Sequence, residues 1–282
     1  MVKIISDSTC DLSQELLKRY DIDIIPLHIV KGEEELEDGP QIDIEALYEW
    51  ADANKTTPKT SAPSIETAMQ IMRPYIEEGR ELICFSISGE MSTSGNVIRM
   101  AAEELEAQEK VTVIDSRNLS TGIGLLVIEA AIMAAKGSSR EEIEKRIGEL
   151  IPKVRASFVV DTLVYLHRGG RCGAASALIG GALALHPMII VKDGKMDASK
   201  KYRGKMGKVI KNYAKDLEED MRKALPDRVF ITHSQCDPAI VDEVRSYIES
   251  LGVFKEILET RAGGVISSHC GPGTLGVLFI EG

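Results

Sequence analysis

The sequence predicts an α/β fold in two parts, and two observations carry that prediction. In the first part, apolar runs of strand length alternate with segments of helical spacing, which is typical of a parallel sheet with right-handed crossovers. After Pro152, strand-like runs dominate, and Asp193-Gly194 is a hairpin signal that indicates antiparallel pairing. We therefore expect an α/β domain with a parallel sheet over residues 1–155 and an α+β domain with a mixed or antiparallel sheet over residues 156–282.

The first part opens with a β-loop-α unit. An apolar run over residues 1–5 ends in a polar turn, and Asp11 is expected to cap a helix with apolar positions at helical spacing through Tyr20. Residues 22–30 are strand-like, and the acidic run that follows, residues 33–35, is expected to be a solvated turn. Two further units are expected to pair strand 81–86 with helix 98–105 and strand 110–114 with helix 125–135.

The second part is expected to contain four strand regions, at residues 156–160, 188–195, 228–233 and 275–280. The 188–195 region holds the hairpin signal. The longest stretch without a charged residue, 172–191, has the length of a membrane span but is broken by glycines and by His186-Pro187. We interpret it as buried helix and strand and expect no stable membrane insertion.

Composition narrows the possible function classes. The 282 residues include 34 Lys and Arg against 44 Asp and Glu, and the resulting net charge of −10 repels nucleic-acid backbones and anionic lipid surfaces. Five cysteines without a CxxC pair favour reduced thiols over a disulfide framework or a zinc site. Acidic residues near the N-terminus interrupt any signal-peptide pattern. We therefore expect a cytoplasmic protein that binds no nucleic acid.

The sequence lacks the GxxxxGK[ST], GxSxG and HExxH motifs, and Gly122-Ile123-Gly124 lacks the third glycine of GxGxxG. What remains is a set of hydroxyl-rich turns, each expected where a strand leads into a helix. Helix capping explains each turn alone. Together, the turns can gather at the strand ends and cradle an anion, with a carboxylate better suited than a phosphate. These turns lie at residues 6–9, 60–64, 86–94 and 115–122.

Two other motifs have both a structural and a functional interpretation. His269 is expected between a strand and a Gly-Pro-Gly turn, where it is either part of the turn or a donor or base for an anionic head group. Arg171 follows the hinge Gly169-Gly170. A defined ligand contact is one interpretation of this arginine, and a structural ion pair is the simpler one.

Six of these segments, in this order, resemble the DegV family, which includes the fatty-acid-binding subunit of bacterial fatty acid kinase. Each motif is weak alone, but the six in register cover nearly the whole chain. The resemblance implies a two-domain DegV-like fold that buries one long acyl chain between the domains, and a lipid carrier without a cofactor or a metal. The segments are residues 4–8, 59–64, 88–102, 113–116, 165–171 and 269–273.

The resemblance also implies a site for the ligand carboxylate, formed by four residues, with two further candidates beside them. The carboxylate-binding residues are Thr60, Ser61, Ser92 and His269, and the further candidates are Arg171 and Gly271. The chain departs from the family pattern where Thr93-Ser94-Gly95 replaces the usual Gly-Thr-Tyr and where His186-Pro187 replaces Lys-Pro.

The leading hypothesis is therefore a non-catalytic binding protein. It would hold a long-chain fatty acid in an enclosed tunnel and present the carboxylate to a separate ATP-dependent kinase, because this chain shows no nucleotide site of its own. The basic stretch 200–205 is either a solvated turn or the kinase-docking surface, with Lys201 and Arg203 as the candidate contacts. The alternative is a lipid hydrolase or acyltransferase with Ser92 as nucleophile and His269 as base.

Overall fold

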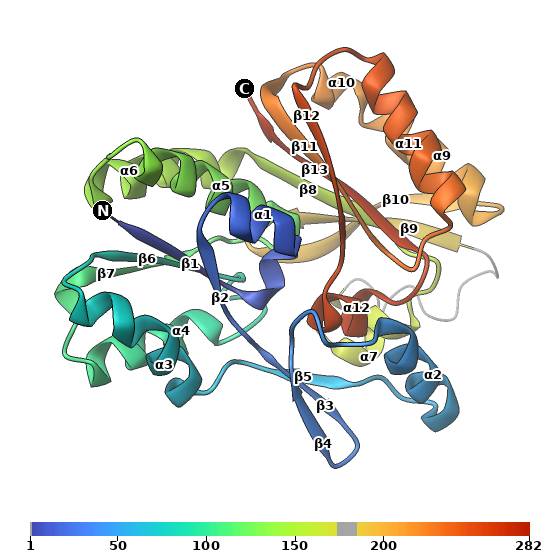
Figure 1. The fold of residues 1–282 in the computed structure, drawn as a ribbon. Helices are drawn as coiled ribbons and strands as arrows, with labels where there is room; N and C mark the ends of the chain where they lie inside the picture. The colour runs from blue at the N-terminus through green and yellow to red at the C-terminus, as the bar shows by residue number, and fades with distance from the viewer. Residues whose placement is uncertain (1, 174–184) are drawn as a thin grey trace.

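The computed structural model describes residues 2–173 and 185–282. Its helices and strands form stacked layers (Figure 1). Helix α5 (Thr121–Ala135) contacts both a four-stranded and a six-stranded sheet, and α6 (Arg140–Leu150) packs beside it. The outer face of the four-stranded sheet is covered by α3 (Ile65–Glu77) and α4 (Ser94–Glu104). These layers confirm the predicted α/β fold.

The four-stranded sheet is parallel throughout, as predicted, with strand order β2-β1-β6-β7. The single strand expected over 22–30 is wrong, because the chain divides at Pro26 into strands of two different sheets. Proline has no backbone N–H to donate to a strand partner. The strands are β1 (Lys3–Asp7), β2 (Ile22–Ile25), β6 (Leu82–Ser86) and β7 (Val111–Asp115).

A small antiparallel sheet, with order β4-β3-β5, was not predicted. Strands β3 (His28–Lys31) and β4 (Glu34–Glu37) form a hairpin through Gly32, whose φ of +65° suits a tight turn. The acidic run expected as a solvated turn is therefore half wrong: its glutamates are exposed, but two of them lie in β4. Strand β5 (Lys59–Ser61) pairs with the other edge of β3.

The six-stranded sheet is mixed, with order β10-β9-β8-β13-β11-β12 and one parallel pair, β11 with β12. Asp193 and Gly194 both have positive φ and join β9 to β10, which confirms the hairpin. For the uncharged stretch 172–191, the strand is confirmed by β9, while the expected helix lies outside the described residues. The strands are β8 (Val154–Val159), β9 (Leu185–Lys192), β10 (Lys195–Arg203), β11 (Ala224–Ser234), β12 (Glu256–Arg261) and β13 (Thr274–Glu281).

The first helix is capped by a different residue from the one expected. Ser13, not Asp11, accepts a hydrogen bond from a backbone N–H of α1, while Asp11 has left-handed backbone angles at the end of the 3-10 turn η1 (Ser8–Cys10). Within the described ranges, no helix is long and apolar enough to cross a membrane. The remaining helices are α1 (Gln14–Arg19), α2 (Ile44–Asn54), α7 (Val164–Gly169), α9 (Met206–Asp216), α10 (Glu218–Met221), α11 (Pro238–Ser250), α12 (Gly264–Cys270) and the 3-10 turns η2 (Gln108–Lys110) and η3 (Ile151–Lys153).

Candidate functional site

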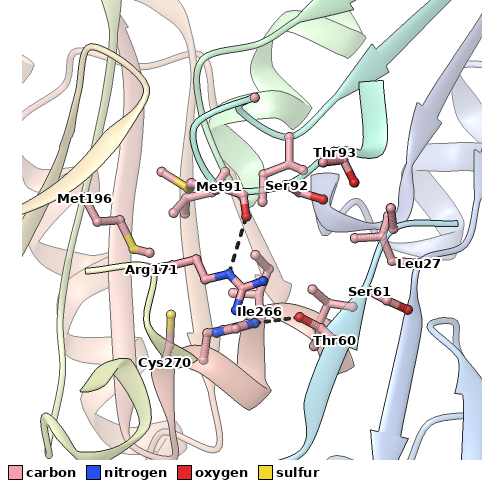
Figure 2. Close-up of a pocket in the computed structure, with 16 residues that line it drawn as sticks. Leu27, Thr60, Ser61, Met91, Ser92, Thr93, Arg171, Met196, Ile266 and Cys270 are labelled. Atoms are coloured by element: carbon pink, nitrogen blue, oxygen red, sulfur yellow. Dashed lines mark hydrogen bonds between the residues drawn. The ribbon is translucent and has the colours of Figure 1, made fainter. Parts of the chain in front are cut away.

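A cavity of about 490 Å³ lies where β5, the loop before α4 and helix α12 meet. Two of the four hydroxyl-rich turns contribute hydroxyls to its lining, the 115–122 turn contributes Leu119, and the 6–9 turn does not line it. Its polar wall, drawn in Figure 2, therefore combines residues that are far apart in the sequence. The polar side chains that line it are Thr60, Ser61, Ser92, Thr93, Arg171 and His269.

Thr60 and His269 form a direct pair in this wall. The Oγ1 atom of Thr60 lies 2.7 Å from Nε2 of His269, and the two residues are 209 positions apart. Thr60 is supplied by strand β5, whereas His269 lies in the last turn of α12. The expectation that His269 lies between a strand and a turn is therefore wrong, because the glycine-started segment 264–270 forms a short helix.

His269 is neutral near pH 7. Burial, with a smaller effect from the positive charge of Arg171, lowers its pKa to about 4. The Nδ1 atom is buried without a hydrogen-bond partner in the described residues, and a Cβ placed on Gly169 would come within 2.2 Å of it. A buried N–H without an acceptor is costly, so the proton belongs on Nε2. Nε2 then donates to Thr60, which leaves the Thr60 hydroxyl hydrogen free for a ligand.

Ser92 lies across the cavity, partly buried, on the loop before α4. Its Oγ accepts a hydrogen bond from the backbone N–H of Ser94 at 3.2 Å. Ser94 in turn donates from its hydroxyl to the buried carboxylate of Asp7 at 2.8 Å, and the same carboxylate accepts from the N–H of Ile87. Ile87 and Ser94 thus fasten the two ends of this loop to Asp7, and of the unusual Thr93-Ser94-Gly95 sequence Ser94 makes this contact.

Arg171 provides a positive charge at the cavity wall. Its Nη1 donates to the carbonyl of Gly169 at 2.8 Å, and its Nε lies 3.4 Å from the carbonyl of Met91 (Figure 2). These two bonds are to backbone, and the described residues show no ion pair for this side chain. The simpler interpretation, a structural ion pair, is therefore unsupported.

Two other residues that the sequence proposes for the site, Ser61 and Gly271, differ from Thr60 and His269 in their position relative to the cavity. Ser61 lines the rim, but its side chain points away from that of Thr60 (Figure 2), as expected for neighbours in a strand. Gly271 does not line the cavity. Its φ is +81°, and a Cβ there would come within 2.7 Å of the ring of Tyr165, so this glycine allows α12 to end against α7.

Lys201 and Arg203 lie on strand β10, not in a turn, and both are exposed. Their neighbour Lys200 is paired with Asp216 at 2.6 Å. Strand β10 also carries Met196, which lines the cavity, so Arg203 lies roughly 20 Å along the strand from the site. Strand β10 thus links the basic stretch to the cavity.

Sequence reasoning missed the part played by buried carboxylates. Asp7, Asp11 and Asp38 are at most 6% exposed, and burial raises the pKa of Asp11 to about 8 and that of Asp38 to about 6. The sequence pattern places Asp7 in a polar turn and Asp11 at a helix cap, and it contains no signal for Asp38. No cluster of three or more His, Cys, Asp or Glu suited to a metal ion occurs in the described parts of the chain.

Comparisons with known proteins agree with this architecture. A model of the DegV family, described as uncharacterised, matches residues 1–282. The chain is 32% identical to a DegV domain-containing protein of Clostridium perfringens, covering 99% of this chain and 98% of the relative. It is 30% identical to a protein of Thermotoga maritima named a fatty acid-binding protein, covering 98% and 96%.

Solved structures show the same likeness. A DegV family protein from Thermus thermophilus, described by its fatty acid binding, has a TM-score of 0.89 at 29% identity, covering 99% of both chains. A stearic acid-binding protein from Eubacterium ventriosum has a TM-score of 0.86 at 30% identity, covering 100% of this chain and 98% of that one. With the family model spanning its whole length, the chain belongs to the DegV family.

Proposed function

We propose that this protein binds a long-chain fatty acid and presents its carboxylate to a separate ATP-dependent kinase in the cytoplasm. The observation that carries the proposal is the Thr60–His269 pair, which faces the cavity opposite Ser92. The relatives named for fatty acid binding support the same ligand class. Because residues from both 1–155 and 156–282 line the cavity, we place the ligand between two domains with those boundaries.

The head group fits this wall chemically. With His269 neutral and donating to Thr60, the hydroxyls of Thr60 and Ser92 are both available as donors to a carboxylate. Arg171 adds a positive charge at the cavity wall. A hydrogen bond to a charged group contributes about 1.5–3 kcal/mol, so these few contacts suffice to select an acid over an uncharged lipid.

The tail has an apolar path. Leu119, Ile266 and Cys270 line the main cavity and also a smaller inner cavity of about 20 Å³, which lies against Phe158 and Leu278 of the six-stranded sheet. We infer that the acyl chain runs inward along these side chains in an enclosed tunnel. Each methylene removed from water contributes about 0.8 kcal/mol.

Among the residues that the structure describes, no contact favours the alternative, a hydrolase or acyltransferase. A serine nucleophile needs a hydrogen-bonded base. Here Nε2 of His269 is engaged by Thr60, and Ser92 Oγ accepts from the backbone N–H of Ser94. We therefore infer a binding role without catalysis or a cofactor.

We further propose that the kinase docks on the exposed basic end of β10, with Arg203 and Lys201 as its contacts. Within the described residues neither side chain has an ion pair, whereas Lys200 is held by Asp216. In a chain of net charge −10, two unpaired cations on an edge strand form a local positive surface. Such exposed charges mainly accelerate association.

Native mass spectrometry of freshly purified protein tests the binding function. We expect a bound, intact fatty acid that is released on unfolding, and no covalent adduct on Ser92. A protein that carries no lipid, and takes up none when offered palmitate, would contradict the proposal. Ester turnover with an acyl group on Ser92 would instead support the enzyme.

A further inference from the structure

Helix α12, which carries His269, begins with two glycines and therefore has no side chain of its own to cap its first turn. The N–H groups of a first turn have no partners within the helix. Two buried carboxyl groups from the distant N-terminal segment act as hydrogen-bond acceptors for these N–H groups. The N–H of Gly263 donates to Asp11 Oδ1 at 2.8 Å, and the N–H of Gly264 donates to Asp38 Oδ1 at 2.8 Å.

The glycines allow this close approach. A Cβ at Gly264 would come within 2.4 Å of Ile29 and 3.0 Å of the Asp38 carboxylate. A Cβ at Gly263 would come within 3.1 Å of the Asp11 carboxylate. The carboxyl groups of Asp11 and Asp38 thus lie close to the backbone at the start of α12. A larger residue at position 263 or 264 would push them away.

The second oxygen of each carboxylate is fastened to a wall of the ligand cavity. Asp38 Oδ2 accepts from the hydroxyl of Ser8, whose oxygen in turn accepts from the N–H of Leu27, a cavity residue. Asp11 Oδ2 is hydrogen-bonded to the hydroxyl of Ser120, next to the cavity residue Leu119. The carboxylates therefore join α12 to two other walls of the same cavity.

We propose that Asp38 and Asp11 are positioning residues of the carboxylate site, which fix α12 so that His269 holds the Thr60 hydroxyl towards the ligand. This inference rests on the proposed fatty acid function. His269 lies five residues beyond Gly264, about 7.5 Å along the helix axis. A tilt of the helix by about 10° at its start would move His269 by about 1.3 Å over that length, enough to break a 2.7 Å hydrogen bond.

The variant Asp38→Ala tests this role when its binding affinities for an acid and for an alcohol of equal chain length are compared. Binding of tetradecanoate and 1-tetradecanol is measured for the wild type, Asp38→Ala, Asp38→Asn and the control Asp43→Asn. Asp43 is an exposed acid in the same region that caps α2, where asparagine is an equally good cap.

We expect Asp38→Ala to weaken tetradecanoate binding tenfold or more and to leave the alcohol within twofold. Asp38→Asn, which keeps an oxygen acceptor for Gly264, should recover most of the loss, and Asp43→Asn should match the wild type. An equal loss for acid and alcohol, or no loss, would overturn the inference. If Asp38→Ala does not fold, Asp11→Ala undergoes the same comparison. Loss of folding in both variants would contradict a positioning role, because it would show that the carboxylates support the fold as a whole.

A ligand-free readout separates this inference from the proposed function. The ¹⁵N NMR signals of the His269 ring report its hydrogen bond to Thr60, and they should shift in Asp38→Ala but not in Asp43→Asn. Unchanged ring signals would overturn the positioning role even if fatty acid binding is confirmed. A wild-type protein that binds the acid no better than the alcohol would instead contradict the proposed function.

Discussion

Gly169 lies directly against His269: a Cβ at this glycine would come within 2.2 Å of the ring atom Nδ1. The contact joins the end of α7 to α12 and leaves no room for another side chain. It also explains why Nδ1 is buried without a polar partner. The orientation of the His269 ring is therefore fixed from both sides, by Gly169 at Nδ1 and by Thr60 at Nε2.

Gly169→Ala should consequently displace the ring and weaken fatty acid binding about tenfold, because the methyl group can be accommodated only if His269 moves. Isothermal titration with palmitate measures the loss. Gly148→Ala is the matched control, since a Cβ there meets nothing within 4 Å and lies in helix α6, where alanine is favoured. Palmitate affinity in Gly169→Ala equal to that of the control would show that the ring is not held by this contact.

The pKa of His269, lowered to about 4 by burial, predicts a pH dependence of stability. Between pH 6.5 and 4 the unfolded chain binds a proton at this residue and the folded protein does not. His269 therefore favours unfolding as the pH falls through this window, by at most about 1.4 kcal/mol per pH unit.

Asp11 acts in the opposite direction. Its pKa is raised to about 8. Between about pH 4 and 8 the folded protein therefore holds a proton on Asp11 that the unfolded chain has lost. The stability that this proton contributes is lost as the pH rises through that window. The comparison must therefore be between wild type and His269→Gln, both of which retain Asp11. Urea unfolding should show the wild type losing stability relative to the variant below pH 6.5. Parallel pH profiles of the two proteins would contradict the assignment of a neutral, buried His269.

The tail path predicts a steep dependence on chain length. Octanoate and palmitate differ by eight methylenes, each contributing about 0.8 kcal/mol when buried, so palmitate should bind at least a hundredfold more tightly. The gain should level off once the tail reaches the small cavity beside Phe158 and Leu278. Similar affinities for the two acids in a competition titration would show that the tail remains in water.

Arg203→Ala should reduce acyl-phosphate formation with the partner kinase while palmitate binding is unchanged, because the residue is exposed at the far end of β10. The reduction should be greatest at low salt, where exposed charges act most strongly. Lys145→Ala removes an exposed cation from α6 and should have no effect. Normal acyl-phosphate formation with Arg203→Ala, at both low and physiological salt, would contradict a kinase-docking role for residues 200–205.

Local sequence patterns predicted the parts of the fold that depend on local chemistry. The alternation of strands and helices gave the parallel sheet, and Asp193-Gly194 gave the hairpin. The three-stranded sheet was missed because three of the four residues of β4 are exposed glutamates, which have low strand propensity, and its pairing with β3 follows the tight turn at Gly32. Pro26 was the available signal for dividing residues 22–30.

For the site, a resemblance identified Thr60, Ser92 and His269, and the structure brings all three to one cavity. The residues that hold them in place could not be found in the same way. Asp38 is an ordinary acidic residue in the sequence, and only its burial against the N–H of Gly264 reveals its contact. Such roles depend on contacts between segments more than 200 residues apart, which one sequence does not show.

Titration of palmitate into Thr60→Val tests the account most directly, because valine keeps the shape of threonine and removes only the hydroxyl between His269 and the carboxylate. The loss of one hydrogen bond to a charged group should weaken binding by about 1.5–3 kcal/mol, roughly 10- to 150-fold, while Thr60→Ser stays near the wild type. Unchanged palmitate affinity in a folded Thr60→Val protein would contradict the claim that the Thr60–His269 pair recognises the carboxylate.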